Sequence, residues 1–184
     1  MQISPGEVVG RVAGVVRFVA NQVHAKLDPL GYARSIGVQI GKNVHFYGMP
    51  PGMFGTEPWL IKIGDGVHIT SGCQFVTHDG GTLILRSEVP DLELTAPIVI
   101  GNDVYIGMRT IILPGVTIGN RCIIGAGSVV TRSIPDNTVA AGVPARVIKS
   151  TDEYLQSAKA RSLKLGHLRG EEKARALKAH FGAK

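Results

Sequence analysis

Aliphatic residues recur at every sixth position through much of the chain. Written in sixes from Ile100, the sequence reads IGNDVY, IGMRTI, ILPGVT, IGNRCI, IGAGSV and VTRSIP. Earlier runs follow the same rule, IGKNVH from Ile40 and IGDGVH with ITSGCQ from Ile63. A period of six matches neither the α-helix nor the strict alternation of a half-buried strand. It is typical of a short strand and a tight turn, repeated so that one aliphatic side chain always points inward.

Hexapeptide repeats of this kind predict a parallel β-helix, in which three hexapeptides make one triangular coil. Successive coils then stack at the spacing of neighbouring strands, and each buries its aliphatic residues only against its neighbours. The first residue of each hexapeptide should form the core, together with a second inward position held by Val104, Val116 and Ser128. Small residues such as Gly101 and Gly107 should let the chain pass its corners.

Three segments lie outside this register. Residues 7–24 place Val8, Val12, Val15, Val16, Val19 and Val23 at helical spacing. This predicts a helix that caps the first coil, with attachment to a membrane surface as the weaker alternative. Residues 80–96 form an excursion from a coil corner, and long loops on a rigid scaffold are usually functional. Residues 152–181 predict one or two helices, broken near Gly166 and Gly170, that cap the last coil.

The chain is therefore expected to comprise an N-terminal helical cap (1–35), a β-helix domain (36–149) with its excursion (80–96), and a C-terminal helical tail (150–184). The stretch from Ile100 to Lys149, with VTRSIP and AAGVPARVIK, resembles the left-handed β-helix acyltransferases, especially the maltose/galactoside O-acetyltransferase and xenobiotic acetyltransferase branch. The block FGTEPWLIKIGDGVHITSGCQFVTHDGG, from Phe54, resembles acetyltransferases of capsule and exopolysaccharide synthesis. This resemblance implies a mainly β, left-handed coil, an acetyl-CoA donor, and a homotrimer with active sites between subunits.

His78 is the candidate catalytic residue, because VTHDGG marks the point where a coil ends and the excursion begins. In the resembling acetyltransferases the histidine at this point takes a proton from the acceptor hydroxyl or amine. Imidazole suits that role at neutral pH. The sequence offers three carboxylates that could orient the ring, Asp79, Asp91 and Glu93, and does not choose among them. A GxSxG nucleophile motif is absent, and Cys73 and Cys122 fall inside regular repeats, which favours direct transfer in a ternary complex.

The resemblance also places the two substrates. The oxyanion should meet a backbone N–H near Gly107 and Met108, where galactoside-type relatives tend to carry a serine instead of the methionine. The residues expected along acetyl-CoA are Tyr105, Gly107, Met108, Gly125, Ala126, Thr131, Arg132, Ala141, Pro144, Arg146 and Lys149. Basic groups among them suit the nucleotide phosphates. Trp59 and Phe54 are candidates to stack on the acceptor sugar, and Trp59 could equally pack against the N-terminal helix.

Composition excludes several other classes. The chain has 184 residues, of which 44% are hydrophobic, so wholesale disorder is excluded. Residues 150–184 hold eight Lys and Arg against four acids, which supplies +4 of the formal +6. Without a nucleic-acid motif, this tail is read as a solvated helix rather than a nucleic-acid site. No signal peptide or membrane span is visible in the pattern, so a cytoplasmic location is expected.

The sequence thus predicts an acetyl-CoA-dependent O-acetyltransferase acting on a hydroxyl of a sugar or polysaccharide precursor. N-acetylation of an amino sugar or of a xenobiotic is the first alternative. A γ-type carbonic anhydrase would need three convergent histidines on zinc, and the close HxxxxH pair typical of that class is absent, so no metal is expected. A non-catalytic hexapeptide scaffold is disfavoured by the excursion and by the VTRSIP and AAGVPARVI segments.

Overall fold

A computed structural model describes the backbone of residues 5–183 and the side chains of residues 11–183. The chain divides into two compact units, one ending at Thr151 and the other beginning at Asp152.

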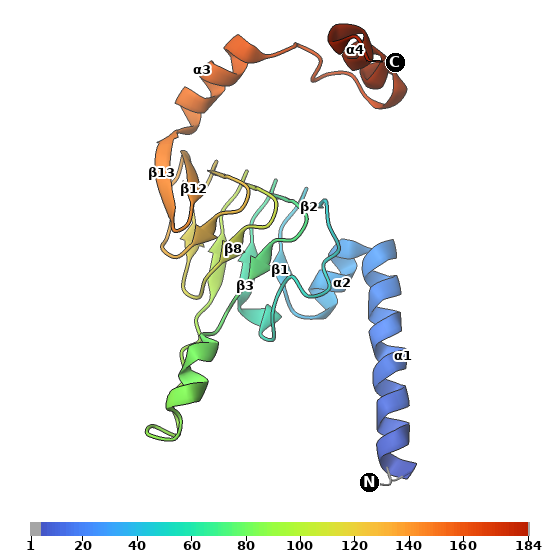
Figure 1. Cartoon of the computed structure of the whole chain (residues 1–184), viewed down its shortest axis with the longest axis vertical. Helices are drawn as coiled ribbons and strands as arrows, with labels where there is room; N and C mark the ends of the chain where they lie inside the picture. Colours follow the sequence, from blue (N-terminus) through green and yellow to red (C-terminus); the bar gives the residue numbers. More distant parts are fainter. Residues whose placement is uncertain (1–4, 184) are drawn as a thin grey trace. The chain divides into compact units, whose positions relative to one another are not determined.

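Short strands in the first unit form three sheets. They are β1 (Gln39–Ile40), β2 (His45–Phe46), β3 (Ile61–Ile63), β4 (His68–Ile69), β5 (Gln74–Phe75), β6 (Ile98–Ile100), β7 (Tyr105–Ile106), β8 (Ile111–Ile112), β9 (Thr117–Ile118), β10 (Ile123–Ile124), β11 (Val129–Val130), β12 (Thr138–Gly142) and β13 (Ala145–Ser150). The sheet orders are β1-β3-β6-β9, β2-β4-β7-β10-β12-β13 and β5-β8-β11. All neighbouring strands are parallel except the β12–β13 hairpin. From β3 to β11 consecutive strands enter successive sheets, so the chain winds in three-sided coils, as the period predicts (Figure 1).

The core of these coils is an aliphatic column. The first residues of the later hexapeptides are at most 1% exposed: Ile100, Ile106, Ile112, Ile118, Ile124 and Val130. The second inward positions are equally buried, with Val104 and Val116 at 1% and Ser128 at 0%. Both predicted sets of core positions are confirmed. Burying one isoleucine side chain stabilises the fold by about 1.5–3 kcal/mol, so the column is the main stabilising feature of the coil.

A ladder of short polar side chains holds consecutive coils in register at one corner. Asp65 Oδ1 accepts a hydrogen bond from the backbone N–H of Lys42 at 2.7 Å. Asn102 Oδ1 accepts from Asp65 N at 2.8 Å, and Asn120 Oδ1 accepts from Asn102 N at 2.9 Å. Asp136 Oδ1 completes the ladder by accepting from Asn120 N at 2.7 Å. Each side chain thereby satisfies a backbone donor of the preceding coil that the strands leave unpaired.

Close approach between coils explains the glycines of the repeat. A Cβ atom at Gly107 would lie 2.4 Å from the backbone nitrogen of Ala126, and one at Gly101 would lie 2.8 Å from the carbonyl carbon of Gly119. Neither glycine has a positive φ; that conformation falls instead on other corner residues, among them Asn43, Asp103, Arg121 and Asn137. Small residues are therefore required, because the next coil passes too close for a side chain.

Helix α1 (Pro5–Leu27) confirms the predicted N-terminal helix, but its valine face does not cap the coil. Val12, Val15, Val16, Val19 and Val23 are between 51% and 63% exposed, and Val8 lies outside the residues whose side chains are described. The short helix α2 (Pro29–Ser35) makes the contact instead, since its Ala33 is fully buried in the core cluster. The expected role of the valines is wrong because two α2 residues, Tyr32 and Ala33, already cover that place.

The excursion leaves the coil after β5 and returns at β6, as predicted. It contains the 3-10 helix η2 (Gly80–Leu85), drawn green in Figure 1. Its two ends are tied together, because Ala96 N donates to Thr77 O at 2.9 Å and Asp79 N donates to Leu94 O at 2.8 Å. A second 3-10 helix, η1 (Pro58–Leu60), precedes β3. The excursion is thus anchored at the corner that carries His78.

The second unit consists of α3 (Thr151–Arg161) and α4 (Gly170–Phe181), the two helices that the sequence predicts on either side of Gly166. Their capping of the last coil stays a prediction. Within the described residues, none of the helices has both the length and the apolarity needed to cross a bilayer.

Candidate active site

His78 lies where the coil gives way to the excursion. Its backbone forms an isolated antiparallel bridge with Thr95, and its side chain is 39% exposed. The ring therefore projects from paired backbone into a region that solvent and substrate can reach. This is the position that the sequence predicts for the catalytic histidine.

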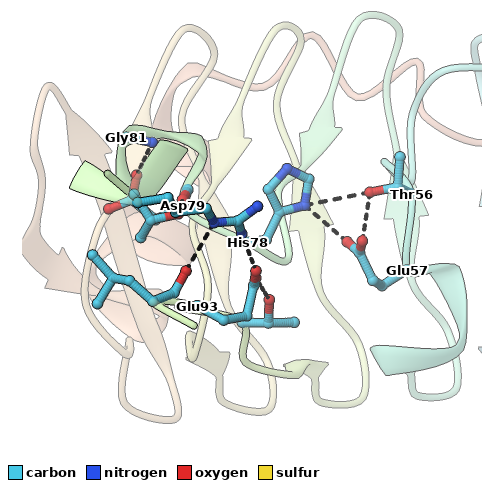
Figure 2. Close-up of polar contacts among 10 residues, drawn as sticks. Thr56, Glu57, His78, Asp79, Gly81 and Glu93 are labelled. Carbon is cyan, nitrogen blue, oxygen red and sulfur yellow. Dashed lines mark hydrogen bonds and ion pairs between the residues drawn. The ribbon is translucent and has the colours of Figure 1, made fainter. Parts of the chain in front are cut away.

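A carboxylate that the sequence analysis did not consider orients the ring. His78 Nδ1 lies 2.9 Å from Glu57 Oε2 and 3.3 Å from Thr56 Oγ1 (Figure 2). Two threonine hydroxyls hold the carboxylate in turn: Thr56 donates to Glu57 Oε1 at 2.6 Å, and Thr77 donates to Glu57 Oε2 at 2.6 Å. The ring is thus fixed through one nitrogen by a carboxylate that is itself fixed.

The electrostatics of this network assign the tautomer of the ring. Hydrogen bonds from Thr56, Thr77 and His78 lower the pKa of Glu57 from 4.5 to about 2. Glu57 is therefore an acceptor at neutral pH, and the hydrogen bond at 2.9 Å places the proton of a neutral imidazole on Nδ1. The lone pair then lies on Nε2, for which no partner is found among the described residues. An imidazole held in this way is prepared to accept a proton at Nε2.

His78 borders two cavities of different character. The larger, about 550 Å³, is lined mainly by apolar groups, including Val76, Leu113 and Pro114, and it reaches Thr131. The smaller, about 400 Å³, is polar, and Glu57 and Arg86 are among its lining residues. Asp79 and Glu93 line both. One imidazole that borders both cavities can contact two substrates at once.

The three carboxylates proposed from the sequence have other partners or none. Asp79 Oδ1 accepts from Gly81 N at 2.9 Å and caps η2 (Figure 2). Glu93 pairs with Arg86 at 2.5 Å and accepts from Thr95 Oγ1. Asp91 is exposed, and no hydrogen bond from it is found among the described side chains. Within the described chain the carboxylate beside the ring is that of Glu57, and none of the three sequence candidates forms a hydrogen bond with His78; an approach of Asp91 or Glu93 from a neighbouring subunit stays a prediction.

The spacing of the coils could have revealed Glu57. Ile40 pairs with Ile63 and His45 pairs with His68, so the first coil advances by 23 residues, since 63 − 40 = 23. Counting back the same number from His78 gives position 55, two residues from Glu57. Phe75 N donates to Met53 O at 2.8 Å, which confirms that this segment runs beside the strand leading to His78. Residues 56–59 (TEPW) therefore lie on the coil that precedes the one carrying His78.

The predicted acceptor aromatics do not meet at this site. Phe54 is 1% exposed and packs against Phe46 and Phe75 in the core, so its assignment to the acceptor is wrong. The backbone turns Phe54 inward because the neighbouring Met53 pairs with Phe75. Trp59 is 58% exposed in η1, and its Cβ lies beside Gly37. It is not among the residues that line the two cavities at His78.

The two backbone N–H groups expected to bind the oxyanion, those of Gly107 and Met108, differ in whether another group already accepts from them. Gly107 N donates to Ile124 O at 2.8 Å within the coil, so this N–H is engaged and its predicted role is wrong. Met108 is half exposed, and its N–H makes no hydrogen bond within the described part of the chain, so it stays a candidate. Tyr105 is 44% exposed on the outer face of β7. None of the three lines the cavities at His78.

The remaining residues that the sequence places along acetyl-CoA lie on the last coils and the β12–β13 hairpin. Thr131 alone among them lines a cavity at His78. Ala141 pairs with Arg146 across the hairpin, whereas Gly125 N is engaged by Ala140 O at 2.8 Å. Exposed side chains complete the set: Ala126, Arg132, Pro144, Arg146 and Lys149. Arg132, Arg146 and Lys149 thus carry three positive charges at the C-terminal end of the coil, where Arg146 Nη1 also donates to Ala145 O at 3.0 Å.

Among the described residues the two cysteines are buried, and the potential metal ligands do not converge. Cys73 and Cys122 are buried free thiols, and burial raises the pKa of Cys73, which suits packing rather than nucleophilic attack. Among the described residues, no group of three His, Cys, Asp or Glu side chains converges as a metal would require.

Three-sided coils of hexapeptides, with a carboxylate-held histidine between two cavities, define a transferase of the hexapeptide class. A family model described as bacterial transferase hexapeptide (six repeats) matches residues 97–132. The chain is 51% identical over 121 residues to protein CapG of Staphylococcus aureus, a match that covers 66% of this chain and 70% of that protein. It is 60% identical over 132 residues to the galactoside O-acetyltransferase of Escherichia coli K12, covering 68% of this chain and 60% of that protein.

A solved structure agrees with these relatives. The hexapeptide-repeat acetyltransferase of Vibrio cholerae in complex with acetyl coenzyme A matches with a TM-score of 0.54 at 27% identity, over 80% of this chain and 90% of that one. The chain therefore belongs to the hexapeptide-repeat acetyltransferases, enzymes that take the acetyl group from acetyl-CoA.

Proposed function

We propose that this enzyme transfers the acetyl group of acetyl-CoA to a hydroxyl of a sugar or polysaccharide precursor, with His78 as general base. The observation that carries the proposal is the hydrogen-bonded series from the threonines through Glu57 to His78 Nδ1 at 2.9 Å, which leaves Nε2 without a partner among the described residues. The sugar acceptor is supported by the similarity to the galactoside O-acetyltransferase and by a polar cavity beside the ring.

In the proposed reaction, Nε2 of neutral His78 takes the proton from the acceptor hydroxyl as its oxygen bonds to the thioester carbon. The ring is then an imidazolium, and the Glu57 carboxylate, with its pKa of about 2, stabilises that positive charge across 2.9 Å. When the carbon–sulfur bond breaks, the imidazolium returns the proton to the departing thiolate. No acyl-enzyme forms, which agrees with the buried, unactivated cysteines.

The donor is proposed to lie against the coil surface that carries Tyr105, Met108, Ala126 and Arg132, and to reach the His78 of a neighbouring copy. The support is that Tyr105 and Met108 are exposed but do not line the cavities of their own chain. A homotrimer of left-handed coils is therefore part of the proposal. Light scattering at micromolar concentration tests the assembly, and a monomeric mass would contradict a donor groove shared between copies.

An amine acceptor is the second candidate function. The polar cavity is lined by three carboxylates, Glu57, Asp79 and Glu93, against one guanidinium, that of Arg86. Because Arg86 is already paired with Glu93, the cavity carries excess negative charge that would favour a cationic acceptor such as an amino sugar.

The experiment that decides between these acceptors is release of free thiol from acetyl-CoA by the purified enzyme. Neutral sugars, nucleotide sugars, glycans, amino sugars and antibiotics are compared as acceptors, with the His78→Ala variant as the blank. Thiol release that needs a hydroxyl acceptor and His78 supports O-acetylation. Release only with amines would replace it by N-acetylation, and release with none of them would contradict the proposal.

A further inference from the structure

Helix α1 carries an apolar face that nothing in the described first unit covers. Its valines follow the helical period: Val12, Val16, Val19 and Val23 are spaced by four, three and four residues, and Val15 lies beside them. At 100° per residue these five side chains occupy an arc of about 100°. Each is more than half exposed, and Leu27 at the end of the helix is 80% exposed. A face of this size is unfavourable in water unless a partner covers it.

The opposite side of α1 is the one attached to the protein. Ala25 is fully buried, and the ring of His24 makes an edge contact with Tyr32 of α2 at 5.8 Å between centroids. Because the attached side and the valine side point in different directions, the apolar face stays free while the helix is anchored through its C-terminal turn.

The charges beside the described valines are all positive, although Glu7 lies earlier in the same helix. From Arg11 to Leu27 the helix carries Arg11, Arg17 and Lys26 and no acidic residue. At 100° per residue, Arg17 lies on the side opposite the valines, Arg11 lies at the margin of the stripe, and Lys26 lies within the arc of the stripe at the C-terminal end of the helix. This is the distribution of an interfacial helix, with an apolar face inserted below basic groups that meet anionic headgroups. No described helix combines the length and the apolarity that crossing a bilayer requires, so α1 would lie on the surface.

Two other partners for the valine face, a second copy of α1 and the C-terminal unit, match its charge less well. Pairing with a second copy of α1 would bring like charges together, and the positions that flank the stripe, such as Ala13, Ala20 and Gln22, carry no charge that could form salt bridges between helices. The C-terminal unit is also basic, with eight Lys and Arg against four acids from Ser150 onward. Charge complementarity therefore favours a negatively charged surface over both.

We infer that α1 attaches the enzyme to an anionic membrane surface, with the valine face in the interfacial layer and Arg11 and Arg17 near the headgroups. The attachment would hold the active site close to that surface. The inference rests on the charge and exposure of α1 and does not depend on the identity of the acceptor.

Sedimentation with vesicles tests the inference. The full chain should sediment with phosphatidylcholine vesicles that contain phosphatidylglycerol and stay in solution with phosphatidylcholine alone. Val16→Gln combined with Val19→Gln should weaken binding at least tenfold without changing the charge. Arg11→Gln combined with Arg17→Gln should weaken it about thirtyfold and reduce its salt dependence. Gly14→Gln is the matched control, because a Cβ there meets no atom within 4 Å and the residue lies away from the valines; it should bind normally.

The opposite results identify the alternatives. Unchanged binding of the valine variant would overturn the inference and assign the attraction to other basic segments, such as the tail. Failure of the wild-type chain to bind anionic vesicles, with a lower oligomeric mass in the valine variant, would overturn it in favour of a second copy. Thermal unfolding of each variant shows whether the coil is intact, which is expected because the substituted valines are exposed.

Discussion

The carboxylate of Glu57 lies 2.9 Å from Nδ1 of His78, although 21 residues separate them and they come from two successive coils. Thr56 and Thr77 both donate to this carboxylate, one from each coil. The hydrogen bonds therefore join the segment before β3 to the start of the excursion. The same contacts that fix the tautomer of the ring also tie two turns of the coil together.

Replacing His78 with alanine should lower turnover by about 10²–10⁴, because the acceptor hydroxyl would lose its base. Acetyl-CoA binding should be nearly unchanged. Thiol release measured over a range of acetyl-CoA concentrations provides both readouts.

The control for this variant is a test that it folds and assembles as the wild type does. Circular dichroism and the mass in solution should equal those of the wild type, since the side chain is 39% exposed. A folded His78→Ala enzyme with near-normal turnover would eliminate the proposed base.

Glu57→Gln should also reduce turnover by about 10²–10⁴, for a different reason. The amide can donate to Nδ1, which favours the tautomer with a proton on Nε2 and removes the lone pair that accepts the acceptor proton. Glu57 acts through His78 and is a positioning residue, so the expected change is in kcat with little change in either KM. Partial recovery in Glu57→Asp would support the role of charge, whereas a rise in acceptor KM alone would indicate a substrate contact instead.

The lowered pKa of Glu57 has a consequence for stability. Because its pKa falls from 4.5 to about 2 on folding, the carboxylate stabilises the folded state above pH 4.5. That contribution should be lost progressively as pH falls from 4.5 towards 2. The difference in unfolding free energy between wild type and Glu57→Gln should therefore be constant near neutrality and shrink over this acidic interval. Urea unfolding at a series of pH values measures it; a difference independent of pH would show that the network does not lower this pKa.

The coil was predictable because its period is a local property. An isoleucine at each sixth position identifies the inward side of every strand before any tertiary contact is known, and Ile106 and Ile124 are indeed fully buried. The pairing of Glu57 with His78 was not apparent in the same way. It depends on the number of residues in the first coil, which is 23 rather than the 18 between Val99 and Thr117, and therefore on an irregular segment.

The N-terminal helix shows a second limit of sequence patterns. A helical period identifies an apolar face, and α1 has one, but the period does not state what the face contacts. The burial of Ala33 and Tyr32 comes from the short helix α2, whose seven residues show too little periodicity to stand out. The turn at Asp28, whose side chain accepts from Gly31 N at 2.8 Å, determines which of the two helices meets the core.

Arg132→Ala and Arg146→Ala should each raise the KM for acetyl-CoA with a smaller effect on kcat. Both side chains are exposed at the C-terminal end of the coil, and loss of one hydrogen bond to a phosphate corresponds to about 1–3 kcal/mol. The rise in KM should therefore lie between roughly fivefold and a hundredfold. Lys173→Ala, on helix α4 of the second unit, is a matched loss of charge that should leave the KM unchanged. An effect confined to the acceptor KM would contradict the proposed position of the nucleotide.

Gly107→Ala should destabilise the coil by about 1–3 kcal/mol, the usual cost of overpacking. The new methyl group would lie 2.4 Å from Ala126 N and 2.7 Å from Ile124 O, and both are backbone atoms of the next coil that cannot rotate away. Gly107 N also donates to Ile124 O at 2.8 Å, so moving the strands apart would weaken a ladder hydrogen bond. Gly80→Ala is the control, since a Cβ there meets nothing within 4 Å, and its unfolding midpoint in urea should match the wild type. Equal midpoints for Gly107→Ala and the wild type would mean that adjacent coils can separate at little cost, and the requirement for glycine at this place in the repeat would need another explanation.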